Sequence, residues 1–137
     1  MQNSPFNPSL IGVSVVTTFL PTHSNPEDNH YTFAYTITIS NASDLPVQLL
    51  SRHWKITDAN ESVQEVRGEG VVGEQPVIAP GDSYRYTSGA TLNTPLGYME
   101  GSYYMVVREP MDMAPEELPT FEVPISPFTL HTPTALN

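Results

Sequence analysis

The sequence contains no cysteine among its 137 residues. This absence excludes disulfides, thiolate nucleophiles, zinc ribbons and iron–sulfur clusters, and it is compatible with a reducing cytosol. The N-terminus lacks a basic region followed by an apolar run, and no segment reaches the ~18 consecutive apolar residues of a membrane span. We therefore expect a cytoplasmic protein that does not associate with membranes.

Basic side chains are scarce, with five Lys and Arg against fifteen Asp and Glu, which gives a formal charge of −10. The resulting field repels phosphate backbones and anionic lipid, so nucleic-acid binding is disfavoured. A metal ion or a basic patch on another protein fits this charge better, although solubility alone also explains it. The length predicts a single domain over residues 1–137, with its core at about 10–132 and flexible ends at 1–9 and 133–137.

Helical periodicity is also missing, because no window of ten residues repeats apolar side chains at i, i+3, i+4 and i+7. Strand signals replace it, most clearly the strict alternation from Tyr31 to Ser40. The sequence predicts an all-β fold, an antiparallel immunoglobulin or fibronectin type III-like sandwich of about seven strands, with a closed barrel as the alternative. The expected strands are 10–20, 31–40, 47–57, 62–67, 83–92, 98–107 and 121–130.

Local features refine this expectation. Trp54 should plug the core from a face shared with Leu50, Arg52 and Ile56. Pro80-Gly81 suits a type II turn, and two prolines, Pro124 and Pro127, make the last strand an edge strand or a bent one. The acidic, proline-rich segment 109–119 is expected to be a mobile loop with one helical turn at 115–118.

Glycines are concentrated between residues 67 and 105, which hold seven of the eight. They include a G-x-G-x-x-G hexad formed by Gly68, Gly70 and Gly73. A dinucleotide site requires a helix after this motif, whereas here two prolines, Pro76 and Pro80, follow and no helix pattern appears. Two interpretations remain: an anion-binding nest of backbone N–H groups assisted by Arg67, and a β-bulge or tight crossing that needs glycine.

Candidate metal ligands share one polar loop. They are His23, Glu27, Asp28 and His30, a set of imidazoles and carboxylates that suits a divalent transition metal. The spacing matches no established metal motif, so a solvated polar loop is the preferred interpretation. No G-x-S-x-G elbow or other catalytic constellation occurs, and we expect neither enzyme activity nor a cofactor.

Five ordered segments resemble the ApaG family, also called CorD, over about residues 10–132. The segments are YTFAYTITISN (31–41), PVQLLSRHWKITD (46–58), EVRGEGVVGEQP (65–76), APGDSYRYTSG (79–89) and TPLGYMEGSYYM (94–105). The resemblance implies a fibronectin type III-like sandwich and an association with cobalt resistance and magnesium efflux. In larger eukaryotic proteins the domain looks like an interaction module, and the hexad implies pyrophosphate binding by analogy. Segment 109–119 and the ending HTPTALN depart from the family.

These observations lead to a ranked expectation. The chain is expected to be a non-catalytic protein interaction module with a protein partner still to be identified. The alternatives are nucleotide or pyrophosphate binding by the loop Gly68 to Gly73, and binding of a divalent metal. Edge pairing of the long alternating strands also makes a homodimer possible.

Overall fold

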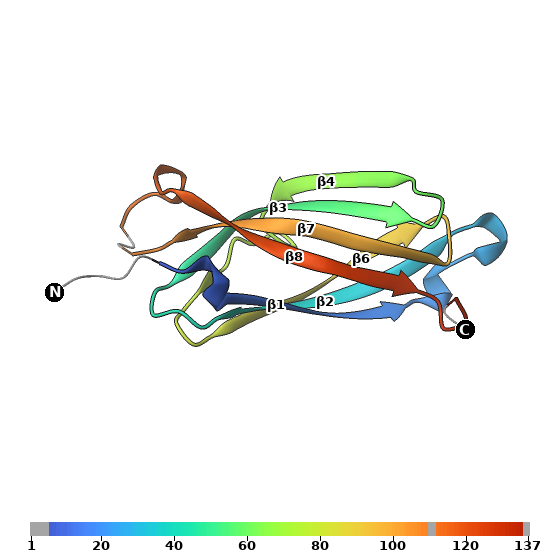
Figure 1. Ribbon diagram of the computed structural model, residues 1–137, viewed down its shortest axis with the longest axis horizontal. Coiled ribbons are helices and arrows are strands. Elements are labelled where there is room, and N and C mark those ends of the chain that lie inside the picture. Colours follow the sequence, from blue (N-terminus) through green and yellow to red (C-terminus); the bar gives the residue numbers. More distant parts are fainter. Residues whose placement is uncertain (1–5, 110–111, 136–137) are drawn as a thin grey trace.

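The computed structural model describes residues 6–109 and 112–135 as a β-sandwich without an α-helix in those ranges (Figure 1). The strands are β1 (Ile11–Phe19), β2 (Tyr31–Asn41), β3 (Val47–Asp58), β4 (Val63–Glu69), β5 (Val77–Ile78), β6 (Ser83–Leu92), β7 (Leu96–Val107) and β8 (Thr120–His131). Four single 3₁₀ turns accompany them: η1 (Pro8–Leu10), η2 (Pro21–His23), η3 (Pro26–Asp28) and η4 (Pro115–Glu117). All seven expected strands are confirmed, and the two-residue β5 was not predicted.

Two antiparallel sheets form the sandwich. One has the order β1-β2-β6, and the other has the order β4-β3-β7-β8 with β5 pairing the start of β3. In an immunoglobulin constant-type sandwich the fourth strand joins the first sheet, whereas here β4 pairs with β3. The predicted antiparallel sandwich is confirmed, and of the two types that the sequence left open the arrangement is the fibronectin type III-like one. The closed barrel is not what these strands form.

Aromatic side chains fill the centre of the sandwich. Trp54 is 2% exposed, and its ring meets those of Tyr35, Tyr103 and Phe128 edge-on, with centroids 5.6–6.2 Å apart. Such edge-to-face contacts add to the area that each ring buries. The prediction that Trp54 plugs the core is confirmed.

A β-bulge at Leu50 changes which face of β3 points inward. The register with β7 jumps from Leu49 to Ser51, so that Leu49 and Trp54 are both buried although they differ in parity. A bulge adds one residue to a strand and thereby reverses the alternation after it. The predicted shared face therefore holds from Arg52 onward, and its inclusion of Leu50 was wrong.

Local turn predictions are also confirmed. Asp82 N donates to Ala79 O at 3.0 Å across a turn in which Gly81 has φ of +81°. Strand β8 is an edge strand. Its register with β7 shifts between Ile125 and Phe128, the part of the strand that contains Pro127. The expected helical turn at 115–118 is present as η4.

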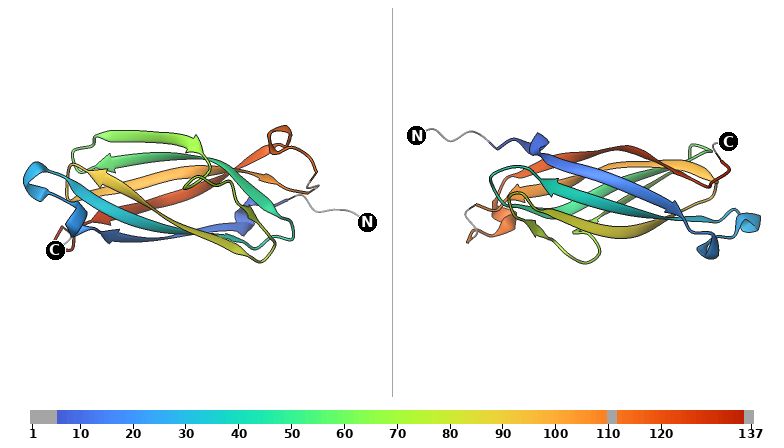
Figure 2. Two further views of the ribbon diagram at one scale, coloured as in Figure 1. Left: turned by 180° about the vertical axis from the view of Figure 1, so that it is seen from behind. Right: turned by 90° about the horizontal axis from the view of Figure 1, so that it is seen from below.

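Strands β1 and β8 run in the same direction and close one side of the sandwich. Near their beginnings the rings of Phe6 and Phe121 lie 4.8 Å apart, and near their ends Thr17 Oγ1 donates to Thr129 O at 3.5 Å. The chain therefore enters β1 at one end of the long axis and leaves β8 at the other (Figure 1). On the opposite side, the segment between β4 and β6 covers the core with Val71, and Tyr84 of β6 donates to Glu74 at 3.0 Å (Figure 2).

The expected flexible ends fall partly on residues 1–5 and 136–137, which lie outside the described ranges. Within the described part, Phe6 already packs against the core. No helix among the described residues is long and apolar enough to span a bilayer.

Candidate functional site

The glycine hexad begins in β4 and leaves the sheet at Gly70. Gly70 N donates to Leu50 O at 2.8 Å, so the bulged residue of β3 provides the acceptor that ends the strand pairing. Gly70 has φ of +64°, and a Cβ built on it would lie 2.3 Å from Glu74 O. Only glycine fits this position, because a side chain would meet both an unfavourable dihedral and a backbone atom.

A tight two-residue turn follows. Val71 N donates to Glu74 O at 2.8 Å, and Glu74 N donates to Val71 O at 2.9 Å. The two residues between them, Val72 and Gly73, have φ of +43° and +82°. Positive φ at both central positions defines a type I′ turn, in which Asn-Gly is favoured and a β-branched residue is strained.

The two valines of the turn have opposite environments. Val71 is 1% exposed and belongs to the core cluster, so it closes the sandwich at this point. Val72 is 57% exposed. The turn therefore buries one valine and displays the other in a strained conformation.

Arg52 anchors the start of the loop through hydrogen bonds to its backbone. Its guanidinium Nη1 donates to Gly70 O at 2.7 Å and to Glu69 O at 3.2 Å. The same group occupies the space next to Gly68, where an added Cβ would lie 2.8 Å from Nη1. A charged donor shared by two carbonyls is a strong hydrogen-bonding arrangement, so Arg52 fixes where the loop leaves β4.

Behind Arg52, the hydroxyls of Tyr86 and Tyr103 hydrogen-bond to each other between the two sheets. Burial raises the pKa of both hydroxyls far above the usual value for tyrosine. Both side chains therefore remain protonated at physiological pH and join β6 to β7. A role as a general base is not available to them.

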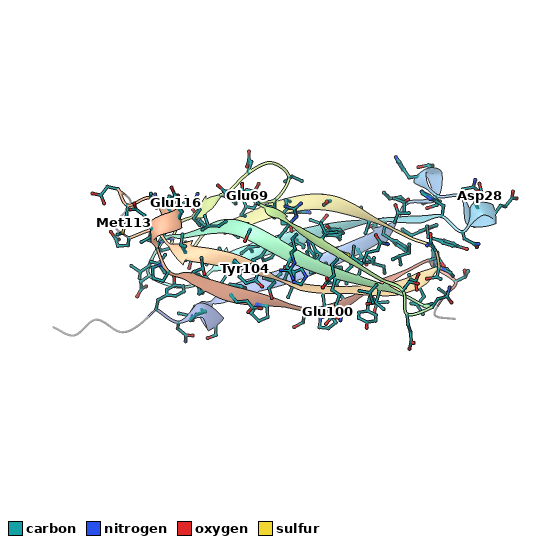
Figure 3. The ribbon with its side chains drawn as sticks, turned by 90° about the horizontal axis from the view of Figure 1, so that it is seen from above. Asp28, Glu69, Glu100, Tyr104, Met113 and Glu116 are labelled. Carbon is teal, nitrogen blue, oxygen red and sulfur yellow. The ribbon has the colours of Figure 1, made fainter. Side chains whose placement is uncertain are left out.

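Acidic side chains border the surface around the turn. A hollow of about 230 Å³ is lined by Glu69, Gly70, Gly73, Glu74 and Gln75. A neighbouring hollow of about 480 Å³ is lined by Leu50, Ser51, Glu69, Gln75, Pro115 and Glu116. Figure 3 shows Glu69 and Glu116 at the same end of the molecule. Cationic groups are therefore favoured here over phosphate.

Comparison with known proteins decides the family. The sequence matches the family described as DUF525, ApaG domain, over residues 21–107. It is 48% identical over 134 residues to Protein ApaG of Dechloromonas aromatica, covering 98% of this chain and 99% of the relative.

The chain belongs to the ApaG family.

Other ApaG proteins are similarly close. Protein ApaG of Azotobacter vinelandii is 51% identical over 127 residues, which cover 93% of this chain and 94% of the relative. The crystal structure of the putative ApaA protein from Bordetella pertussis superposes with a TM-score of 0.81 at 47% identity. That alignment covers 91% of this chain and 95% of the other. The hexad and Arg52 lie inside the matched ApaG domain, and residues 109–119 follow its end.

The predicted anion site is only partly assembled in this ApaG chain. The N–H groups of Gly70 and Val71 already bind carbonyls of the same chain, and Gly68 faces Arg52. Arg67 is exposed on β4, and strand alternation places it on the face opposite to Gly68. The loop folds toward the core at Val71, and Arg67 is not among the residues that line the hollow at the turn.

The candidate metal ligands lie away from the glycine loop, and Figure 3 shows Asp28 and Glu69 toward opposite ends of the molecule. His23 lies in η2, Glu27 and Asp28 lie in η3, and His30 forms a bridge with Asn25. Asp28 Oδ2 accepts a hydrogen bond from Asn25 Nδ2 at 2.7 Å. Across residues 6–109 and 112–135, no three His, Asp or Glu side chains are placed to hold one metal ion.

Sequence reasoning missed Arg52 and Val72 as parts of the site. Arg52 bonds to carbonyls 17 and 18 residues later in the chain, a contact that no local pattern encodes. Val72 carried a usable signal, since valine stands where the type I′ turn would favour asparagine. The valine is informative only if a type I′ turn is first predicted within the hexad.

Proposed function

We propose that this ApaG chain is a non-catalytic module that binds a protein partner through the Val71–Glu74 turn. The observation that carries the proposal is Val72, a β-branched residue with φ of +43° that is 57% exposed. Strained residues persist where the surrounding fold over-determines them, and they cluster at functional positions. An exposed apolar side chain at the tip of such a turn suits insertion into a pocket of another protein.

The charge around the turn defines the surface that the partner should offer. Glu69 and Glu74 flank the tip, and Glu116 lies next to the adjoining hollow. The whole chain carries a formal charge of −10. An apolar pocket rimmed by Lys or Arg would match both features, and the charge would accelerate the encounter. Cobalt resistance and magnesium efflux, which the family resemblance implies, would then act through this partner in the cytoplasm.

Val72→Asn separates the binding role of the turn from its structural role. Asparagine tolerates positive φ, so the free energy of unfolding of the variant, measured by urea titration, should be about 0.5–1 kcal/mol higher than that of the parent. In a pull-down from bacterial lysate with quantitative mass spectrometry, the same variant should lose the proteins that the parent retains. Stability and binding are thus expected to change in opposite directions.

The matched control is Val16→Asn, because Val16 is another exposed valine, located on β1 and 68% exposed. This variant should retain the partners of the parent. Equal capture by Val72→Asn and the parent would contradict the proposal, as would loss of the same proteins from Val16→Asn.

The nucleotide and metal hypotheses have separate tests. Titration calorimetry with diadenosine tetraphosphate at millimolar concentration is expected to give no binding heat, because Glu69 and Glu74 border the loop and two of its N–H groups are occupied. Measurable binding heat would contradict this expectation and support the nucleotide hypothesis instead. The metal hypothesis requires that equilibrium dialysis retain at least one Co²⁺ or Mg²⁺ per chain at His23 to His30. Retention of less than one ion would exclude it.

A further inference from the structure

Strand β4 is an exposed edge. It is the outermost strand of its sheet, and among the described residues it pairs only with β3 (Figure 1). All of its residues except Gly68 are exposed, including Val63 at 49% and Val66 at 38%. An edge of this kind presents unpaired backbone groups and is a template for another strand.

The backbone groups that β4 offers follow from its pairing with β3. Asp58 N donates to Ser62 O at 3.0 Å, and Gly70 N donates to Leu50 O at 2.8 Å. Even-numbered residues of β4 therefore face β3, because antiparallel strands alternate between bonded and non-bonded pairs. The outward N–H and C=O groups belong to the odd-numbered residues, namely Val63, Glu65, Arg67 and Glu69.

We propose that a second copy of this chain pairs with β4 in the antiparallel direction, about a two-fold axis that passes through Val66. This register places Glu65 opposite Arg67 of the partner subunit and Arg67 opposite Glu65 of the partner subunit. Each odd residue then meets an odd residue, which is what ladder hydrogen bonds across this edge require. Val66 is the midpoint of Val63–Glu69, so the whole strand is used.

The charges select this register from its neighbours. An axis at Glu65 would set that carboxylate against its own copy, and an axis at Arg67 would do the same with the guanidinium. Like charges directly opposite each other destabilise a sheet, and opposite charges stabilise it. Arg67 forms no ion pair with any of the described residues of its own chain, and its cross-strand neighbour is His53. The second copy supplies the missing carboxylate.

On each face of the sheet, the side chains of β4 would also meet compatible side chains of the second copy. Glu65 contacts His53 at 3.3 Å on the outer face of the sheet, and Arg67 shares that face. Val66 lies on the inner face beside Trp54 and would meet its own copy at the axis. Half-exposed apolar surface is thus covered while both charges remain at the solvent-facing side. The two four-stranded ladders become one continuous sheet.

The dimer should be weak and dependent on concentration. Two seven-residue edges bury less than the ~1,200 Å² typical of a stable interface. We expect a dissociation constant on the order of 100 μM. Dimerisation does not involve Val72, so it goes beyond the partner binding proposed above and does not depend on it.

Sedimentation equilibrium over a wide concentration range tests the proposal with two charge reversals. Arg67→Glu creates two Glu–Glu pairs across the axis, and Glu65→Arg creates two Arg–Arg pairs. Each variant alone should dimerise at least about tenfold more weakly than the parent. An equimolar mixture should recover the parent affinity, because every pair in the mixed dimer is again of opposite charge. Thermal melts confirm that each variant is folded.

Amide exchange measured by NMR locates the interface. The N–H groups of Glu65 and Arg67 should become protected as concentration rises, whereas the outward amides of β6 should not. A parent chain that stays monomeric at millimolar concentration would overturn the proposal. So would single variants that dimerise like the parent, or a mixture that remains as weak as its components. Because Val72→Asn leaves β4 unchanged, failure of the dimer and failure of partner binding are distinguished.

Discussion

Gly101→Ala is expected to cause the largest loss of stability of any substitution proposed for this chain. Gly101 lies opposite Trp54 where β7 pairs with β3, and an added Cβ would be 2.0 Å from His53 O. The obstacle is backbone in the middle of the sheet, so it cannot rotate away as a side chain could. We expect a loss of at least about 4 kcal/mol, within reach of the whole stability of a small domain. Urea titration followed by tryptophan fluorescence measures it.

The matched control is Gly12→Ala in β1, where nothing lies within 4 Å of the added Cβ and no positive φ is involved. This variant should stay within about 1 kcal/mol of the parent, since alanine replaces glycine in a strand without a clash. A Gly101→Ala protein with the parental urea midpoint would show that the strands are not this closely spaced.

Gly70→Ala is expected to produce the second-largest loss, about 3–4 kcal/mol. The methyl group would displace Glu74 O, open the turn and expose Val71, which is otherwise buried in the core. Exposing a valine costs about 1.5–2 kcal/mol, and the positive φ and the broken turn account for the remainder. The measurement is equilibrium unfolding, supplemented by amide exchange at Val71.

Gly73→Ala isolates the dihedral contribution. Gly73 has φ of +82° but open space around its Cβ position, so only the conformational cost of about 1 kcal/mol should appear. If the two substitutions proved equally costly, the close approach to Glu74 O would not be the cause. Partner binding should be lost in Gly70→Ala even at temperatures where the sandwich remains folded.

The strands could be predicted from sequence because alternation is a local property. Residues 31–40 alternate without interruption, and the structure places β2 at Tyr31–Asn41. The bulge at Leu50 could not be predicted, because the adjacent Leu49 and Leu50 fit opposite phases of the alternation and the sequence does not say where the phase changes. The outcome was decided by β7 and by Gly70, which donates to Leu50 O.

The interpretation of the glycine-rich segment was correct in general terms, but the sequence could not tell which glycine serves which purpose. The sequence predicted that these glycines adopt unusual backbone dihedrals or allow close approach to a ligand or another chain. The structure contains the dihedrals at Gly70 and Gly73, and the close approach at Gly101 is to the backbone of the same chain. Spacing cannot distinguish these cases, because the neighbouring backbone comes from a strand about fifty residues earlier.

The sequence drew attention to the glycine loop but not to the residue that supports it. The loop Gly68 to Gly73 is the surface feature, yet Arg67 points to the other face of β4 and Arg52 supports the loop instead. Only the register between β3 and β4, which pairs Arg52 with Gly68, makes that visible.

The parallel course of β1 and β8 has a consequence for how this unit can be built into longer polypeptides. Because an odd number of long strands crosses the molecule, the chain arrives at one pole and departs from the other (Figure 1). Domains fused before and after it would be separated by the full length of the sandwich. Neither neighbour would be directed toward the flank formed by β4 and β6, so a fusion protein could add partners in series while that flank stays accessible.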